Sequence, residues 1–137
     1  MNLLHFADVH LGMTNYGWQD VHTGLHTRIL DYLDAMDAIC SVAEYSKPDI
    51  IAFAGDAFRT RTPSPTLTKL FADRIVRLAN VAPVLMVLGN HDRQSVEGKH
   101  HSIDIMSQLQ AKHPIYVSSD VEVMQMGCAV VVTLPWL

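Results

Sequence analysis

Three short apolar runs in this chain each end in side chains that can bind a metal ion or transfer a proton. The runs are Leu3–Ala7, Asp49–Ala54 and Val84–Leu88. Carboxylate and amide oxygens combined with imidazole nitrogens suit hard or borderline divalent ions, and Mn²⁺ is the first choice, with Mg²⁺, Fe²⁺ and Zn²⁺ as alternatives. The side chains that follow the runs are Asp8 and His10, then Asp56, then Asn90, His91 and Asp92.

Each of these side chains has a chemical role that its type suggests. One carboxylate can bridge two ions roughly 3.5–4 Å apart, and such ion pairs hold both the attacking and the leaving oxygen of a phosphoryl displacement. Asp56 follows the middle run and is therefore the expected bridge. Asn90 would serve as a neutral ligand, because another carboxylate would repel an anionic phosphate. His91 would donate a proton or hydrogen bond, with Asp92 orienting its ring.

Taken one at a time, these motifs have simpler explanations. A loop-capping aspartate beside a surface histidine accounts for Asp8 and His10, and Gly55-Asp56 is an ordinary turn. A turn at Gly89 has less use for the His-Asp pair that follows. The coincidence of all three motifs at the ends of apolar runs favours one shared site.

The elements between the runs would bring these ends together. Apolar residues recur at helical spacing from Leu25 to Ala43, and Pro48 ends that helix. Ser64 and Pro65 are typical of an N-cap and first helical position. The order is therefore β-α-β-α-β, and near-continuous apolar strands are typical of a parallel sheet buried on both faces. Ligands gather at the carboxyl edge of such sheets. Further elements are expected over 102–110 (a helix) and over 115–117, 121–126 and 128–134 (extended).

The composition suits one globular domain over residues 1–137, with 49% hydrophobic and 18% charged residues. No apolar stretch approaches the ~20 residues of a membrane span, and the start lacks a signal-peptide pattern, so we expect a cytoplasmic protein without a membrane partner.

Cys40 and Cys128 form no CxxC motif and are expected as reduced core residues. Arg74 and Arg77 are expected as solvated helix charges.

The formal net charge of −4 argues against a uniformly basic nucleic-acid coat. The segment from Ala57 to Arg93 is nevertheless locally basic. Within it, Arg59, Arg61 and Arg93 lie just beyond the metal-ligand motifs and are candidates for contacts to substrate phosphates.

Three signatures, Asp8-x-His10, Gly55-Asp56 and Gly89-Asn90-His91-Asp92, resemble those of the calcineurin-like metallophosphoesterases. The wider segments His5–Gly12 and Gly55–Phe58, together with Leu134-Pro135-Trp136, resemble the nuclease subunit of SbcC–SbcD-type double-strand-break repair complexes.

The resemblance implies an α/β fold, the N-terminal half of a β-sandwich flanked by helices, with a mainly parallel βαβαβ first sheet. It implies a DNA exo- or endonuclease that uses two Mn²⁺ ions and an SbcC-type ATPase partner. Asp8 and His10 would hold the first ion, Asp56 both and Asn90 the second, with His91 as the catalytic histidine.

This chain departs from the pattern of the family it resembles in two ways. Some members carry a histidine where this chain has Arg59, and the family's three later histidine ligands come from Gly-His and Gly-His-x-His motifs that this sequence does not contain. We therefore expect a truncated domain without its C-terminal half and cap domain, an incomplete ligand set and low activity of this chain alone. The positive mean hydropathy of +0.14 would then reflect uncovered apolar surface and favour a homodimer or other self-association.

Two other functions are compatible with the same residues. A phosphomonoesterase or cyclic-nucleotide phosphodiesterase would use the same metals on smaller substrates. A non-catalytic module of this fold would serve as a partner-binding scaffold, although its ligand residues would be expected to have eroded.

Overall fold

A four-stranded parallel sheet forms the centre of the computed structural model, which describes residues 1–94 and 100–136. Its strands lie side by side in chain order and are β1 (Leu3–Phe6), β2 (Ile50–Phe53), β3 (Val84–Val87) and β4 (Ile115–Ser118). The connecting helices are α1 (Thr27–Ser46), α2 (Pro65–Ala79) and the short 3₁₀ helix η1 (Asp104–Gln108). A separate antiparallel hairpin consists of β5 (Glu122–Met126) and β6 (Ala129–Thr133).

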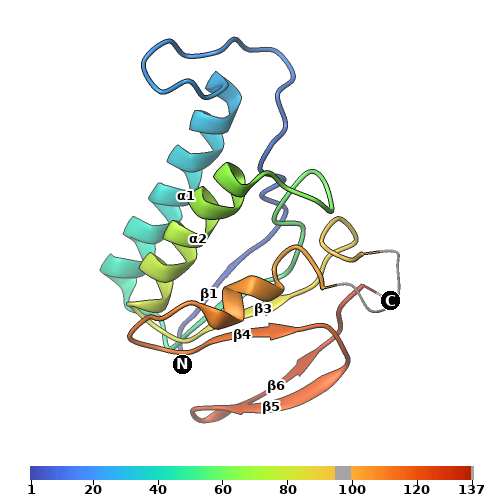
Figure 1. Ribbon diagram of the computed structural model, residues 1–137. Helices are drawn as coiled ribbons and strands as arrows, with labels where there is room; N and C mark the ends of the chain where they lie inside the picture. Colours follow the sequence, from blue (N-terminus) through green and yellow to red (C-terminus); the bar gives the residue numbers. More distant parts are fainter. Residues whose placement is uncertain (95–99, 137) are drawn as a thin grey trace.

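The parallel sheet lies between two layers. Helices α1 and α2 pack side by side over one face, and the β5–β6 hairpin covers part of the other (Figure 1). Phe53 on β2 contacts Phe71 on α2 with ring centroids 5.7 Å apart, so the helical side holds the main core. Ile50 and Leu85 meet Met126 of the hairpin on the other side. The expected α/β class and the parallel βαβαβ sheet are confirmed.

Local signals set the helix boundaries where the sequence predicted them. The Ser64 hydroxyl accepts a hydrogen bond from the backbone N–H of Leu67, and Pro65 is the first residue of α2. Helix α1 ends at Ser46, and Lys47 takes a left-handed conformation just before Pro48. Among the described residues, no helix is long and apolar enough to cross a membrane.

The short helix predicted over 102–110 is present as the 3₁₀ helix η1, which is shorter than predicted. Met106 is the buried residue of η1, and the apolar residues that flank the helix, buried Ile103 and partly buried Leu109, are each three positions away from it. That spacing matches three residues per turn rather than 3.6. The amphipathic pattern therefore buries its apolar face best as a 3₁₀ helix.

Three further expectations differ from the structure. Strand β1 is an edge strand with Leu3 55% exposed, so it is not buried on both faces. Cys40 is buried as expected, but Cys128 lies exposed at the β5–β6 turn. The Arg74 side chain is only 17% exposed and pairs with Asp37 of α1 at 2.7 Å, so it joins the two helices rather than being a solvated charge.

Candidate metal centre

The loops that follow β1 and β2 lie against each other because they continue the pairing of their strands. The backbone N–H of Asp8 donates to the Gly55 carbonyl at 3.0 Å, and that of His10 donates to the Asp56 carbonyl at 3.0 Å. This backbone ladder fixes the relative position of the two loops before any side-chain interaction is considered. It therefore places the β1 motif directly beside the β2 motif.

Backbone strain is concentrated in these loops. Of the five non-glycine residues with positive φ in the described part of the chain, three are Asp8 (56°), His10 (48°) and Asp56 (60°). Such conformations cost roughly 1–3 kcal/mol each and persist where the surrounding structure enforces them, often at functional sites. The backbone ladder and the close approach of Gly55 to Gly89 provide that enforcement.

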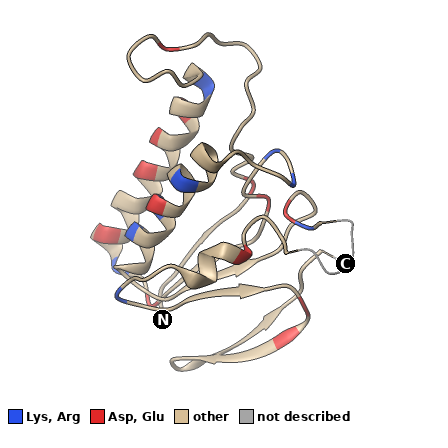
Figure 2. Cartoon of the chain, viewed as in Figure 1, with Lys and Arg blue, Asp and Glu red and all other residues tan. Residues whose placement is uncertain are grey.

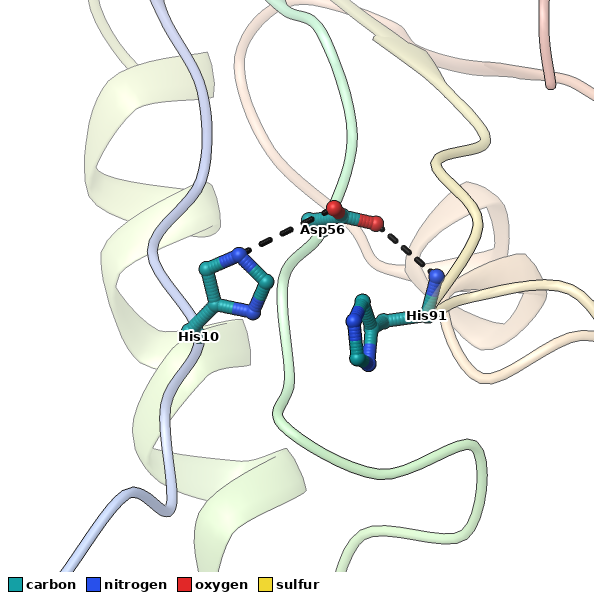
Figure 3. A group of neighbouring side chains, drawn as sticks. All are labelled: His10, Asp56 and His91. Carbon is teal, nitrogen blue, oxygen red and sulfur yellow. Dashed lines mark hydrogen bonds and ion pairs between the residues drawn. The ribbon is translucent and has the colours of Figure 1, made fainter.

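Donor atoms of His10, Asp56 and His91 converge at the carboxyl edge of the sheet, all within 4.8 Å of one another (Figure 3). His10 Nε2 is 3.7 Å from Asp56 Oδ2 and 3.6 Å from Asp8 Oδ1. The other Asp56 oxygen, Oδ1, accepts a hydrogen bond from the backbone N–H of His91 at 2.9 Å. Figure 3 shows Asp56 lying between the two histidines. The structure thus brings together residues from all three predicted motifs.

The His91 ring is oriented by the backbone of the β2–α2 loop. Its Nδ1 lies 2.9 Å from the carbonyl oxygen of Arg59. Because a carbonyl only accepts hydrogen bonds, Nδ1 must carry the proton, and Nε2 is left for ligand or substrate. The ring also contacts the His10 ring edge to face, with centroids 5.0 Å apart.

Asp92 does not orient the His91 ring, and that prediction is wrong. Its carboxylate is 0% exposed and accepts backbone N–H groups from both neighbouring loops. Asp56 N–H donates at 2.7 Å, Ala57 N–H at 3.0 Å and Gly89 N–H at 3.1 Å. Adjacent residues of the turn point their side chains apart, so Asp92 turns inward. Burial raises the pKa of the Asp92 carboxyl, and the bonds from the three N–H groups oppose that shift.

Two glycines allow the β2 and β3 loops to approach each other. A Cβ at Gly55 would lie 2.5 Å from Gly89 N, and a Cβ at Gly89 would lie 2.5 Å from Asp56 N and closer still to the Asp56 carboxylate. Gly55 also has a φ of +94°, a conformation that side chains disfavour. The glycine that precedes each motif is therefore needed to place Asp56.

The other predicted ligands lie nearby. Asn90 and Asp56 both line a cavity of about 720 Å³ between β2, β3 and the segment after β6. The Asp8 side chain is 72% exposed and reaches the site through its proximity to His10.

The three candidate arginines differ in their surroundings. Arg59 and Arg61 are exposed in the β2–α2 loop, where Figure 2 shows basic positions beside the acidic ligand loops. Arg93 donates from Nη1 to the Trp136 carbonyl at 2.7 Å, which ties it to the segment after β6. Arg59 and Arg61 are therefore more exposed to solvent than the partly buried Arg93.

Sequence reasoning missed the part that Ser102 plays at this site. Its hydroxyl lies 3.4 Å from Asp92 Oδ1, and its backbone N–H donates to the Asp92 carbonyl at 3.1 Å. No local motif marks Ser102, because the contact joins positions ten residues apart. The close approach of Gly89 to Asp56 did have a sequence signal, because a glycine directly precedes both Asp56 and Asn90.

The donor set suits a divalent metal ion. Two donor atoms that are each about 2.1 Å from one ion lie roughly 3–4 Å apart, and the His10 distances to Asp8 and Asp56 fall in that range. One carboxylate and two imidazoles, partly shielded from solvent, are ordinary ligands for such ions.

Comparison with known proteins agrees with this fold. Residues 1–127 match the family model described as calcineurin-like phosphoesterase, and the chain belongs to that family. It is 32% identical over 94 residues to the D subunit of the SbcCD nuclease of Bacillus subtilis, covering 67% of this chain and 22% of that protein. It is 35% identical over 114 residues to the DNA double-strand break repair protein Mre11 of Archaeoglobus fulgidus, and this match covers 80% of this chain and 24% of that protein. The D subunit of the SbcCD nuclease of Escherichia coli K12 is 33% identical over 110 residues, and this match covers 80% of this chain and 25% of that protein. The matched segments thus span about a quarter of those relatives.

Proposed function

We propose that this chain is part of a Mn²⁺-dependent DNA exo- or endonuclease that hydrolyses phosphodiester bonds in DNA repair. The observation that carries the proposal is the convergence of His10, Asp56 and His91 beside an exposed loop that bears arginines. The names of the SbcCD and Mre11 relatives support DNA rather than a small phosphoester as substrate.

The proposed mechanism gives each residue a distinct part. Asp8, His10, Asp56 and Asn90 would hold two divalent ions. When bound, such ions supply Lewis acidity at the phosphate and a nucleophile at neutral pH. His91 would present Nε2 to the phosphate or leaving oxygen, because Nδ1 is engaged by the Arg59 carbonyl.

The exposed guanidinium groups of Arg59 and Arg61 would contact the DNA backbone, since phosphate contacts position a duplex without reading its sequence. Arg93 would contribute to the same surface only if its bond to the Trp136 carbonyl were exchanged for a phosphate. The arginines therefore position the substrate, and the ligand residues act on the phosphate.

The proposal extends to partners and location. We propose that the whole protein acts on DNA with an SbcC-type ATPase subunit, in the cytoplasm. Homodimerisation or self-association is supported by the outer face of the β5–β6 hairpin, where Val123, Val130 and Val132 are all exposed. An apolar patch of this kind on a soluble surface marks an interaction site.

The test begins with metal binding. Calorimetry with Mn²⁺ should show binding by the wild-type chain and its loss in Asp56→Ala. The matched control is Asp73→Ala, which removes an exposed carboxylate that pairs with Lys69 on α2, away from the site. Equal Mn²⁺ binding by the wild type and Asp56→Ala would refute the site.

Substrate class is tested next, on linear duplex DNA and on small phosphomonoesters and cyclic nucleotides. For the whole protein of which this chain is proposed to be part, the expected result is Mn²⁺-dependent cleavage of DNA that Asp56→Ala abolishes and Asp73→Ala preserves. Turnover of the small phosphoesters alone would favour the phosphomonoesterase or phosphodiesterase alternative. Absence of Mn²⁺ binding even by the whole protein would favour the non-catalytic module.

A further inference from the structure

Asp92 connects three segments, and two of them, the loops after β2 and β3, carry the candidate site residues Asp56, Asn90 and His91. Its Oδ2 accepts the backbone N–H groups of Asp56 (2.7 Å) and Gly89 (3.1 Å), and its Oδ1 accepts that of Ala57 (3.0 Å). Its backbone carbonyl accepts the N–H of Ser102 at 3.1 Å. One residue therefore connects the β2 loop, the β3 loop and the segment that leads into η1.

The network acts on the Asp56 side chain at close range. Asp56 takes a left-handed backbone conformation with a φ of 60°, which a non-glycine residue holds only under constraint. The shortest bond to Asp92 comes from the N–H of Asp56 itself, and the Asp56 carboxylate is held at its other end by the His91 N–H at 2.9 Å. Asp56 is thus fixed at its backbone by Asp92 and at its side chain by His91.

The chemistry of the three donors requires an anion rather than an amide. All three groups that face the carboxylate from the loops are N–H donors. Charge-assisted hydrogen bonds of this kind are stronger than neutral ones. An asparagine at the same position would offer one oxygen and would direct an NH₂ group at an N–H donor, leaving a buried repulsion.

From these contacts we infer that Asp92 is a positioning residue for metal binding: it sets the Asp56 carboxylate and the His91 backbone by holding the β2 and β3 loops together. This inference rests on the proposed metal site. It gives Asp92 no contact with metal or substrate, so the residue acts through Asp56 and His91.

The test compares Asp92→Asn with the control Asp104→Asn. Asp104 is a partly buried carboxylate in the next element that accepts the His101 N–H at 2.8 Å and touches no candidate ligand. Both variants are measured by calorimetry with Mn²⁺ at a temperature where circular dichroism shows each to be folded. We expect Asp92→Asn to weaken Mn²⁺ affinity by roughly 10–100-fold, the range for residues that orient metal ligands, and Asp104→Asn to leave it within about 2-fold.

A second measurement does not depend on metal. Amide hydrogen exchange followed by NMR should show the Asp56, Ala57 and Gly89 protons to be protected in the wild-type chain although they lie in loops. In Asp92→Asn these three protons should exchange faster, and in Asp104→Asn they should be unchanged. If Asp92→Asn does not fold, the wild-type pattern still decides, because unprotected amides at these three positions would contradict the network.

The outcomes separate the two proposals. Wild-type affinity in Asp92→Asn overturns the positioning role and leaves the metal site intact. Absence of Mn²⁺ binding by the wild type overturns the metal site, and the exchange data then decide whether Asp92 holds the two loops. Weakened affinity in both variants to the same degree shows a general effect of stability and overturns the inference.

Discussion

Replacement of Gly89 by alanine tests how tightly the β2 and β3 loops are packed around Asp56. The added Cβ would lie 2.5 Å from Asp56 N and still closer to its carboxylate oxygen. Both are atoms of a residue held in place by Asp92 and His91, so a shift of either atom disrupts those hydrogen bonds. The Asp56 carboxylate must therefore shift.

The loss of stability in Gly89→Ala follows from the steric overlap of the added Cβ with Asp56. Overpacking a closely packed site costs about 1–3 kcal/mol, and contact with fixed backbone favours the upper end, about 3 kcal/mol. For a domain of this size each kcal/mol lowers Tm by roughly 3–4 °C, so Gly89→Ala should lower it by about 10 °C. Displacement of the proposed bridging carboxylate should also weaken Mn²⁺ binding by at least about 10-fold.

Gly24→Ala is the matched control. Gly24 has a φ of +70° with no atom within 4 Å of an added Cβ, so only the backbone conformation is penalised, by about 1–2 kcal/mol. Melting curves and Mn²⁺ calorimetry on both variants provide the assay. The packing argument fails if Gly89→Ala melts no lower than Gly24→Ala and binds Mn²⁺ like the wild type.

Other consequences follow from burial and charge. Burial raises the pKa of the Cys40 thiol to about 11, whereas Cys128 is exposed. Iodoacetamide at pH 8 should therefore modify only Cys128 in the native chain and both cysteines after denaturation. Two adducts on the native chain in mass spectrometry would contradict this. Hydrogen bonds from Arg77 lower the pKa of Glu44, so their pairing stabilises the fold at neutral pH and is lost as pH falls through that lowered pKa. Glu44→Gln should thus lower Tm at pH 7, and this loss should shrink as the pH is lowered below the ordinary range of a glutamate. A loss of Tm that does not change with pH would rule the pairing out. Val132→Lys, on the exposed face of the β5–β6 hairpin, should reduce self-association measured by sedimentation velocity. A wild-type chain that stays monomeric would show that this face does not mediate self-association.

The sequence by itself predicted the elements whose signals are local. Ser64 and Pro65 mark the start of α2, and apolar runs that end in Gly-Asp or Gly-Asn mark strands followed by sharp turns. Because parallel strands share a carboxyl edge, residues that follow different strands were expected to meet, and His10, Asp56 and His91 do. Periodicity and strand order were sufficient for this.

Only the tertiary structure decided where adjacent side chains point and what lies opposite them. Sequence proximity suggested that Asp92 supports His91, yet the turn directs Asp92 inward to the N–H groups of Asp56 and Gly89, and His91 is held by the Arg59 carbonyl. Those partners come from other loops, and their relative position depends on strand register. Strand β1 is exposed because it lies at the edge of the sheet, and Arg74 pairs with Asp37 because α2 packs against α1. Both features depend on long-range packing. Residue types and spacing thus determined which groups gather at the site, and the packing of the loops determined what each of them does there.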